Sequence, residues 1–253
     1  MKNIILIGSG NVATKIGLFL YSNGYKITQV WSRKITNAKV LSKKINSYPI
    51  DNLNKIKRAD LYIIAVKDDK IEYVINNIQN KINNVVHTSG STSINVFKNK
   101  FKNFGVFYPL QTFKTENTLN MKEIPICIEA NNESFQKKLM DLANNFSNEI
   151  ILIDSHQRNI IHLAAVFSCN FTNHMFSISQ KLLEKSNIDF KILIPLIKQT
   201  ILQIEKKRPS ELQTGPAARK DLKTIKNHLK SISDKKVKEI YNILTNSIMN
   251  NEK

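Results

Sequence analysis

The sequence predicts an α/β domain built on a doubly wound, mostly parallel sheet, followed by an all-α domain. A short apolar strand pattern at the N-terminus leads into a glycine turn and a helical pattern. Further short apolar runs alternate with helical patterns as far as residue 153, which is typical of a parallel sheet with helices on both faces. After residue 153 apolar residues recur at helical spacing with few strand signals. We therefore predict two domains, residues 1–153 and residues 154–253.

Length and composition fit this organisation. A chain of 253 residues with 42% hydrophobic content can bury a core in each of two domains. No apolar run approaches the roughly 18 residues of a membrane span, and the run that ends at Ile7 is shorter than the roughly 7 to 15 residues of an export signal. The two cysteines, Cys127 and Cys169, stand among apolar neighbours. They predict no disulfide framework and no metal site, and they fit a reducing cytoplasm.

The net charge of +18, from 38 Lys and Arg against 20 Asp and Glu, raises the alternative of a nucleic-acid binder. However, the lysines are spread along the chain and are not gathered into one run with aromatic residues between them. We interpret them as solvated surface and expect no nucleic-acid partner. A basic surface would still concentrate anionic ligands, including a phosphorylated dinucleotide.

The N-terminal segment predicts a strand, a turn, a helix and a second strand. The strands are Asn3–Ile7 and Tyr25–Trp31, and Gly24 closes the helix between them. Apolar residues recur along the helix at Val12, Ile16, Phe19 and Leu20.

The turn itself, Gly8-Ser9-Gly10-Asn11-Val12-Ala13, has the G-x-G-x-x-A pattern of the Rossmann dinucleotide-binding fold. The first glycine makes the tight turn, the second lets a pyrophosphate approach the backbone, and Ala13 permits close packing of helix and strand. Free N–H groups at the helix start attract phosphate. A plain glycine turn in another α/β fold is the alternative interpretation. The predicted pyrophosphate contacts are Gly8, Gly10, Asn11 and Val12.

The end of the second strand indicates which dinucleotide binds. Sites for NAD usually place a carboxylate there, about twenty residues after the glycines. This chain has Ser32, Arg33 and Lys34 instead. A hydroxyl and two cations suit a 2′-phosphate, so the sequence favours NADP(H). The alternative is a solvated basic turn.

Further strands are predicted at 59–66, 83–87, 104–107, 126–128 and 150–153, with a helix over 71–78. Ligands of such sheets bind beyond the carboxyl ends of the strands. Loops 8–13, 66–69 and 87–91 should meet there. We expect Val66 and Asp68 to flank the nicotinamide, and His87, Ser89 and Ser91 to face the substrate.

The second half predicts a helix from Ser155 toward Lys185. His162, Asn170 and His174 are spaced by multiples of four along it and should share a face of an otherwise buried segment. They are candidates for a substrate cleft, with His162 as proton carrier and Asn170 orienting a carbonyl or an alcohol. Satisfied core residues or a subunit interface would explain the same pattern.

Two more helices are expected, over 188–206 and 234–249. Between them, Thr214 and Pro216 indicate another helix start, with Arg219 on its first turns. A cation there is disfavoured by the helix dipole unless an anion uses it, which makes Arg219 a candidate substrate contact.

The motifs IGSGNVA, AVKDD, VVHTSGS, GVFYPLQTF, HLAAVFSCNFTNH and LQTGPAARKD together resemble a bacterial family that spans nearly the whole chain. Its members pair a Rossmann-like domain with a helical C-terminal domain of unknown function, and they are described as NADP- or deazaflavin-dependent oxidoreductases. The resemblance implies a place in the 6-phosphogluconate dehydrogenase-like superfamily. There the helical domain supplies substrate residues and commonly builds a homodimer.

The sequence also differs from better-known members of this superfamily. β-Hydroxyacid dehydrogenases hold a carboxylate with a Ser-Gly-Gly turn, similar to Ser89-Gly90-Ser91, and they place a lysine beside an asparagine matched by Asn170. That lysine is missing here. The histidine that prephenate dehydrogenase-like enzymes place before the proline matched by Pro109 is also missing, and the Ser-Gly-Ser-Gly-Pro helix start of pyrroline-5-carboxylate reductases is not found.

These observations predict an NADP-dependent oxidoreductase that moves a hydride to or from a small carbonyl, imine or hydroxy-acid substrate held between the domains. The alternative is a non-catalytic dinucleotide-binding or regulatory protein, because fold alone does not fix function.

Overall fold

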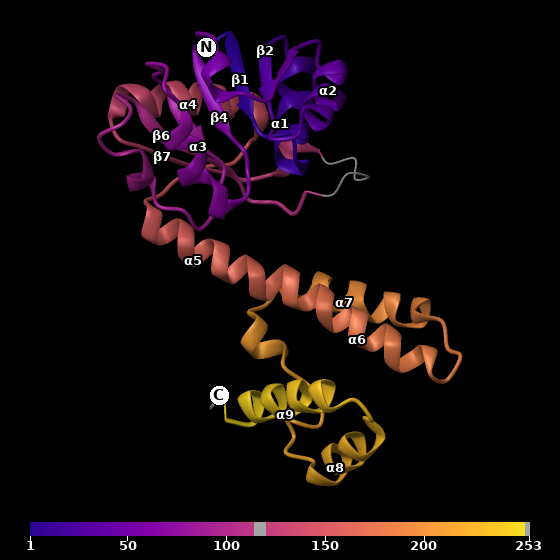
Figure 1. Cartoon of the computed structure of the whole chain (residues 1–253). Coiled ribbons are helices and arrows are strands. Elements are labelled where there is room, and N and C mark those ends of the chain that lie inside the picture. The colour runs from indigo at the N-terminus through magenta and orange to yellow at the C-terminus, as the bar shows by residue number, and fades with distance from the viewer. Residues whose placement is uncertain (114–119, 251–253) are drawn as a thin grey trace. The chain divides into compact units, whose positions relative to one another are not determined.

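An eight-stranded sheet forms the first unit of this computed structural model, which describes residues 1–113 and 120–250 (Figure 1). The strand order is β3-β2-β1-β4-β5-β6-β7-β8, and neighbouring strands are parallel except for the antiparallel pair β6 and β7. A helical region follows the sheet, so the predicted fold class is confirmed. The strands are β1 (Asn3–Ile7), β2 (Lys26–Trp31), β3 (Tyr48–Ile50), β4 (Leu61–Ile64), β5 (Val85–His87), β6 (Phe104–Pro109), β7 (Ile126–Ala130) and β8 (Ile150–Leu152).

The central strands bury both faces, which explains their continuous apolar runs. Ile4 and Leu6 of β1 pack in one core cluster with α1, α2 and α4, whereas Ile5 and Ile7 pack in a second cluster with α3. Helices therefore cover both faces of the sheet. The helices of this unit are α1 (Asn11–Ser22), α2 (Ile35–Lys44), α3 (Ile71–Asn77), α4 (Glu133–Phe146) and α5 (Ser155–Ala165).

The strand order changes direction at β1 and β4. From β1 the chain moves outward to β2 and β3, whereas β4 lies on the other side of β1 and leads on to β5 and β6. At such a reversal the loops after the two central strands separate and leave a crevice. Loops 8–13, 66–69 and 87–91 follow β1, β4 and β5, so they reach the same edge of the sheet as predicted.

Helices α2 and α4 and the short strand β3 have no counterpart among the predicted elements. Most of α2 is polar, and only Ala38, Leu41 and Ser42 are buried, so its periodic signal is weak. The three residues of β3 are too few to form an alternating pattern. Helix α4 does carry apolar residues at helical spacing and could have been predicted.

The second unit, Phe167–Lys253, is helical in the residues that the structure describes. The chain passes from α5 through a π-helical segment, Val166–Phe171, into α6, which confirms the long helix predicted from Ser155 toward Lys185. The division into compact units falls after Val166, and the predicted boundary at residue 153 marks the end of the sheet. The helices here are α6 (Thr172–Glu184), α7 (Ile194–Ile204), α8 (Leu222–Ser231) and α9 (Lys235–Asn250).

Two predicted helix starts in this unit are wrong. The helix expected from residue 188 begins at Ile194, because a 3₁₀ segment precedes it and a proline occupies its first turn. The helix expected near Pro216 begins at Leu222, with Asp221 as N-cap. Gly215 (φ 98°) and Lys220 (φ 54°) adopt left-handed backbone conformations, so the residues between them form turns.

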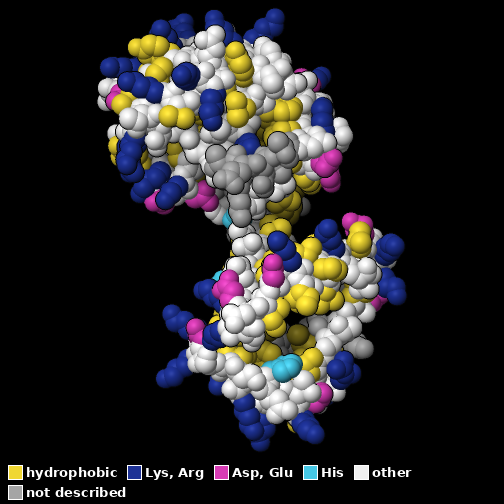
Figure 2. Space-filling view, turned by 90° about the vertical axis from the view of Figure 1, so that its right-hand side faces the viewer, with side chains coloured by type: hydrophobic (Ala, Val, Ile, Leu, Met, Phe, Trp, Pro, Cys, Tyr) yellow, Lys and Arg dark blue, Asp and Glu magenta, His cyan; other side chains and the backbone are white. Residues whose placement is uncertain are grey.

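The distribution of charged and apolar side chains on the surface indicates which kinds of partner the protein could bind. Figure 2 shows Lys and Arg side chains spread over the face in view and not gathered into one patch. The segment around the π-helix was expected to be buried, but Leu163, Phe167 and Phe171 are 56%, 62% and 48% exposed. The expectation of burial is therefore wrong for these three side chains in the single chain. Among the described residues no helix has the length and apolarity to cross a bilayer.

Candidate active site

A cavity of about 880 Å³ opens at the carboxyl ends of β1, β2 and β4. Its walls come from the glycine turn, from the residues after β2, and from the segment after β4. A cavity of this size at the switch point of an open α/β sheet is the expected place for a dinucleotide. Its lining residues are Gly8, Ser9, Gly10, Asn11, Val12, Trp31, Ser32, Arg33, Ala65, Val66, Lys67, Asp68, Asp69, Lys70, Tyr73, Val74, Thr88 and Phe113.

The glycine turn has the geometry that a phosphate cradle needs. Gly8 has a φ of 133°, and a Cβ on it would lie 2.1 Å from the carbonyl oxygen of Ala65, so only glycine fits. Its N–H donates to the carbonyl oxygen of Trp31 at 2.9 Å. Gly10 is the N-cap of α1, and a Cβ there would meet no described atom within 4 Å. The space over Gly10 is therefore open to a phosphate at the positive end of the helix dipole.

The end of β2 presents a hydroxyl and a cation to the same cavity. The Ser32 and Ser9 hydroxyl oxygens are hydrogen-bonded at 2.9 Å, with Ser9 as donor. Arg33 is exposed and lines the cavity. Lys34 was predicted to join them, but it is the N-cap of α2 and is not among the lining residues.

Side-chain hydrogen bonds tie the turn after β5 to the loop after β4. The Ser91 hydroxyl donates to the Asp68 carboxylate at 2.7 Å. The Ser89 Oγ accepts from the backbone N–H groups of Ser91 and Thr92 at 3.1 and 2.9 Å. Val66 lies two residues before Asp68 in the cavity wall. The structure thus brings Val66, Asp68, Ser89 and Ser91 together.

His87 lies beneath this turn. Its side chain is fully buried and packs on Phe97, with ring centroids 5.4 Å apart. Burial, together with the positive charge of Arg158, lowers the pKa of His87 to about 3. Its Nδ1 accepts a hydrogen bond from the N–H of Ser89 at 3.2 Å. A buried neutral imidazole supports the turn from below, so we assign it this role in place of the predicted substrate contact.

His162 of α5 meets Tyr108 of β6 over Gly90. The Tyr108 hydroxyl lies 3.1 Å from Nδ1 of His162, and the two rings are edge to face. A Cβ on Gly90 would lie 2.6 Å from Nδ1 and 2.9 Å from Cζ of Tyr108, so the pair needs a bare backbone beneath it. Burial raises the pKa of Tyr108 to about 12, so its hydroxyl keeps its proton at neutral pH.

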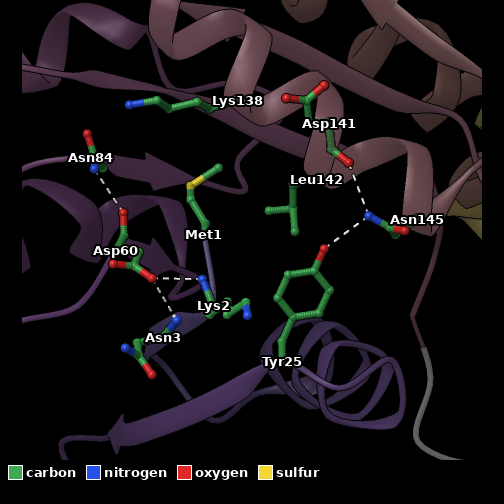
Figure 3. A pocket seen from close by; sticks show the side chains of 10 residues that line it. All are labelled: Met1, Lys2, Asn3, Tyr25, Asp60, Asn84, Lys138, Asp141, Leu142 and Asn145. Carbon is green, nitrogen blue, oxygen red and sulfur yellow. Dashed lines mark hydrogen bonds between the residues drawn. The ribbon is translucent and has the colours of Figure 1, made fainter.

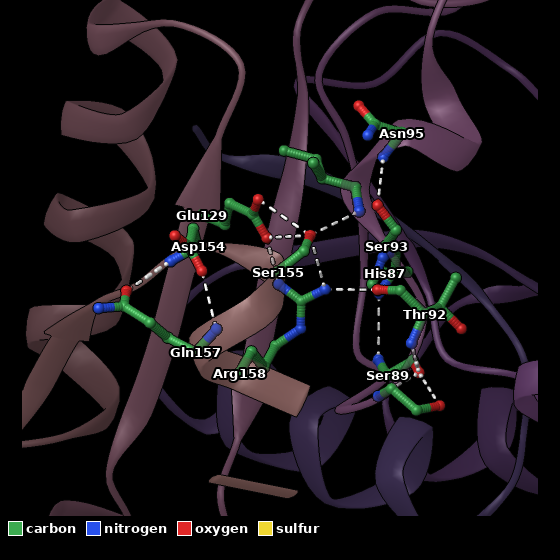
Figure 4. Close-up of polar contacts among 12 residues, drawn as sticks. His87, Ser89, Thr92, Ser93, Asn95, Glu129, Asp154, Ser155, Gln157 and Arg158 are labelled. Carbon is green, nitrogen blue, oxygen red and sulfur yellow. Dashed lines mark hydrogen bonds and ion pairs between the residues drawn. The ribbon is translucent and has the colours of Figure 1, made fainter. Parts of the chain in front are cut away.

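A buried ion pair fixes the start of α5 against the sheet and the turn after β5 (Figure 4). Arg158, which is 1% exposed, pairs with the Glu129 carboxylate of β7 and donates to the carbonyl oxygen of Thr92. The Ser155 hydroxyl donates to the same carboxylate at 2.8 Å. His162 follows Arg158 by one helical turn, so this network sets where the His162 ring lies.

Asn170, His174 and Arg219 are exposed and belong to the second unit. Asn170 lies in the π-helical segment, whose turns hold more residues than α-helical turns. The predicted common face of His162, Asn170 and His174 therefore does not hold as argued. Arg219 precedes the N-cap of α8, so the helix-dipole argument does not apply to it. Contact of these three residues with a substrate stays a prediction.

The sequence did not predict three residues that support the site, namely Tyr108, Glu129 and Arg158. Tyr108 begins the YPLQTF motif, in which the resemblance concerned the residue expected before Pro109 to be histidine. The available signals were a polar aromatic residue at the end of an apolar strand and an arginine one turn before His162. Their partners are distant in sequence, so pairing could not be deduced without the fold.

A second hollow, of about 690 Å³, lies at the start of β1 and β4, at the opposite edge of the sheet (Figure 3). Hydrogen bonds from the N–H groups of Asn3 and Lys2 lower the pKa of Asp60 there. The Asn145 amide donates to the Tyr25 hydroxyl at 3.0 Å. The polar groups of this hollow are hydrogen-bonded to one another. The hollow also lies at the edge of the sheet opposite the cavity that holds the glycine turn, so we do not include it in the candidate site.

A Rossmann-type sheet with a glycine cradle, a cavity and a polar turn at one edge defines an NAD(P)-binding fold of the oxidoreductase class. The comparisons agree, since residues 3–89 match the family described as NADP oxidoreductase, coenzyme F420-dependent, and residues 124–248 match a domain of unknown function, DUF2520. The chain is 37% identical to a candidate NADP oxidoreductase from Bacteroides fragilis, over 98% of each chain, with a TM-score of 0.90. The chain therefore belongs to this two-domain NADP oxidoreductase family.

More distant structures share the fold. A protein from Thermotoga maritima is 22% identical, with a TM-score of 0.77 over 97% of this chain and 99% of that one. A reductive aminase from Aspergillus terreus, in complex with NADPH and ethyl levulinate, is 11% identical, with a TM-score of 0.72 over 99% and 95%. A search of curated proteins gave no match. The family membership indicates a nicotinamide or related dinucleotide as cofactor.

Proposed function

We propose that this protein is an NADP-dependent reductase that acts on a small carbonyl or imine compound. The observation that carries the proposal is that the glycine cradle, the Ser32–Arg33 segment and the Tyr108–His162 pair all lie at one edge of the sheet. Gly8 and Gly10, with Asn11 and Val12, would hold the pyrophosphate. Ser32 and Arg33 would bind the 2′-phosphate, and Val66 and Asp68 would border the nicotinamide.

The residues present fit such a cofactor. The Gly8 backbone conformation and the empty space over Gly10 match the cradle, and Arg33 supplies a guanidinium suited to a phosphate. When bound, the nicotinamide supplies a hydride at C4. The chain has to bind the dinucleotide, orient the substrate and provide a proton. The Ser89–Ser91 turn and His162 are the groups at this edge that can orient a polar substrate and carry that proton.

The relatives support a carbonyl or imine as substrate. The Aspergillus reductive aminase, which is in complex with NADPH and ethyl levulinate, shares this fold over 95% of its chain at 11% identity. We also propose a cytoplasmic location, which the sequence context of the two cysteines led us to expect. The family description also names coenzyme F420, so a deazaflavin is a second redox partner to test.

Replacing Arg33 tests the choice of cofactor. We expect Arg33→Ala to weaken NADPH binding about tenfold or more and to leave NADH binding nearly unchanged, because only NADPH carries the 2′-phosphate. Fluorescence titration with both nucleotides measures this. Lys39→Ala removes another exposed cation from α2 and serves as control. Equal loss for both nucleotides, or loss in the control, would refute the 2′-phosphate assignment.

Turnover separates an enzyme from a non-catalytic binding protein. NADPH absorbance should fall in the presence of a small panel of cyclic imines, keto acids and an oxidised deazaflavin. Tight NADPH binding with no oxidation by any member would favour the non-catalytic alternative.

A further inference from the structure

We propose that Tyr108 is the positioning residue that makes His162 a proton carrier, and that the two side chains act as a hydroxyl–imidazole dyad seated on Gly90. This inference rests on the proposed function for its reaction. The arrangement itself stands on described contacts within the first unit.

The packing leaves one ring nitrogen of His162 for a ligand. Nδ1 is engaged by the Tyr108 hydroxyl at 3.1 Å and lies against the backbone of Gly90. No partner of Nε2 is found in the part of the chain that the structure describes. The imidazole is only half buried, so Nε2 is the nitrogen that can meet a substrate.

The hydroxyl suits a histidine that changes its protonation state. A tyrosine O–H can donate to a bare nitrogen and can also accept from an N–H, so the contact survives proton loss and gain. When the hydroxyl accepts from Nδ1–H, the neutral ring has its lone pair on Nε2. The ring can then take up and release a proton at the ligand side while it keeps its orientation.

The position of the dyad is held from two sides. The Arg158–Glu129 ion pair anchors α5 one turn before His162, and Arg158 also binds the carbonyl oxygen of Thr92 in the turn that contains Gly90. The same turn is joined to the cavity wall through the bond from Ser91 to Asp68. The dyad therefore packs on Gly90, and the turn that contains Gly90 is hydrogen-bonded to Asp68 in the cavity wall.

The proton balance of the step is simple. A bound reduced nicotinamide would supply the hydride that adds to the substrate carbon as the π bond of C=O or C=N breaks. The oxygen or nitrogen gains one proton from Nε2–H of the His162 imidazolium. His162 is left neutral with its proton on Nδ1, hydrogen-bonded to Tyr108, and water returns the proton to Nε2.

Nitrogen-15 NMR of histidine-labelled protein tests the dyad without cofactor or substrate. In wild type above the titration range, the neutral His162 ring should carry its proton on Nδ1. In Tyr108→Phe the ring should revert to the Nε2–H form that free histidine prefers. A wild-type ring with its proton on Nε2, or a ring unchanged by Tyr108→Phe, would overturn the proposal.

The chain offers a matched control. Tyr241 and Nδ1 of His228 form a second tyrosine–histidine pair, 2.9 Å apart, in the second unit. Tyr241→Phe removes the same kind of bond and should leave the His162 tautomer unchanged.

Turnover gives the second readout. With an accepted imine or keto acid, Tyr108→Phe should lower kcat roughly 10- to 100-fold while NADPH affinity is kept. A kcat equal to wild type would overturn the proposal. NADPH affinity of the wild type is measured on the same samples, and its absence would refute the proposed function without affecting the tautomer result.

Discussion

The buried His87 couples folding to pH at the scale of a single residue. Its pKa falls from 6.5 to about 3 in the folded chain, because burial disfavours the charged ring and Arg158 adds repulsion. Below pH 6.5 the unfolded chain binds a proton that the folded chain does not bind. The stability contributed by the neutral ring is therefore complete above pH 6.5 and is lost as the pH falls toward 3.

Replacing His87 should flatten this dependence. Between about pH 4 and 6 the free energy of unfolding should change less steeply in His87→Gln than in wild type, by up to about 1.4 kcal/mol per pH unit. Urea unfolding at several pH values measures the slope. His156→Gln, on an exposed histidine, should keep the wild-type slope, and an unchanged slope in His87→Gln would contradict the account.

The buried Arg158–Glu129 ion pair should contribute to the stability of the protein. Arg158→Met leaves the Glu129 carboxylate without its partner in a largely buried place, so we expect the free energy of unfolding to fall by about 3 kcal/mol. Replacing both residues by apolar ones should recover much of that loss. Urea denaturation of the two variants compares them, and a single variant as stable as wild type would contradict a structural role for the pair.

In the turn between β1 and α1, one glycine is needed for folding and another for ligand binding. Gly8 is the glycine that folding needs. Gly8→Ala would push a Cβ into the carbonyl of Ala65 and strain a positive φ, so it should destabilise the protein by about 3 kcal/mol. Thermal unfolding measures this. A variant with the wild-type Tm would show that the turn is not as tightly packed as the structure has it.

Elements with a strong local pattern could be predicted, and those that depend on distant partners could not. Residues 4–7 and 61–64 are continuous apolar runs, because both faces of the sheet are covered. Helix starts in the second unit were misplaced, since left-handed φ values at Gly215 and Lys220 depend on tertiary context. The G-x-G-x-x-A pattern of the glycine turn was enough to predict phosphate binding. The contact between Tyr108 and His162 could not be predicted, because the two residues are far apart in the sequence and only the fold brings them together.

For the whole molecule, the main open feature is a set of large apolar side chains that are exposed in the second unit. Large exposed side chains include Phe167 and Phe171 of the π-helical segment and Ile192, Leu196 and Ile201 in or next to α7. Exposed apolar side chains in this number favour association with another copy, as the family resemblance implied. The homodimer stays a prediction.

A charge placed among these exposed apolar side chains should disrupt the association. We expect wild type to be a dimer by light scattering at micromolar concentration and Leu196→Glu to be largely monomeric, because burying a carboxylate is costly. Lys198→Glu adds a negative charge on the other side of α7, about 200° around the helix axis from Leu196, and serves as a control. A wild-type monomer would contradict the prediction.

The central claim is that backbone groups at the glycine turn hold the diphosphate of a nicotinamide dinucleotide. Calorimetric titration of NADPH into wild type and Gly10→Ala at low ionic strength tests it most directly, because a Cβ at Gly10 touches nothing in the described protein and intrudes only on a ligand. We predict single-site binding to wild type and at least about tenfold weaker binding to a variant of unchanged Tm. No heat with wild type, or equal affinity of the two proteins, would contradict the claim.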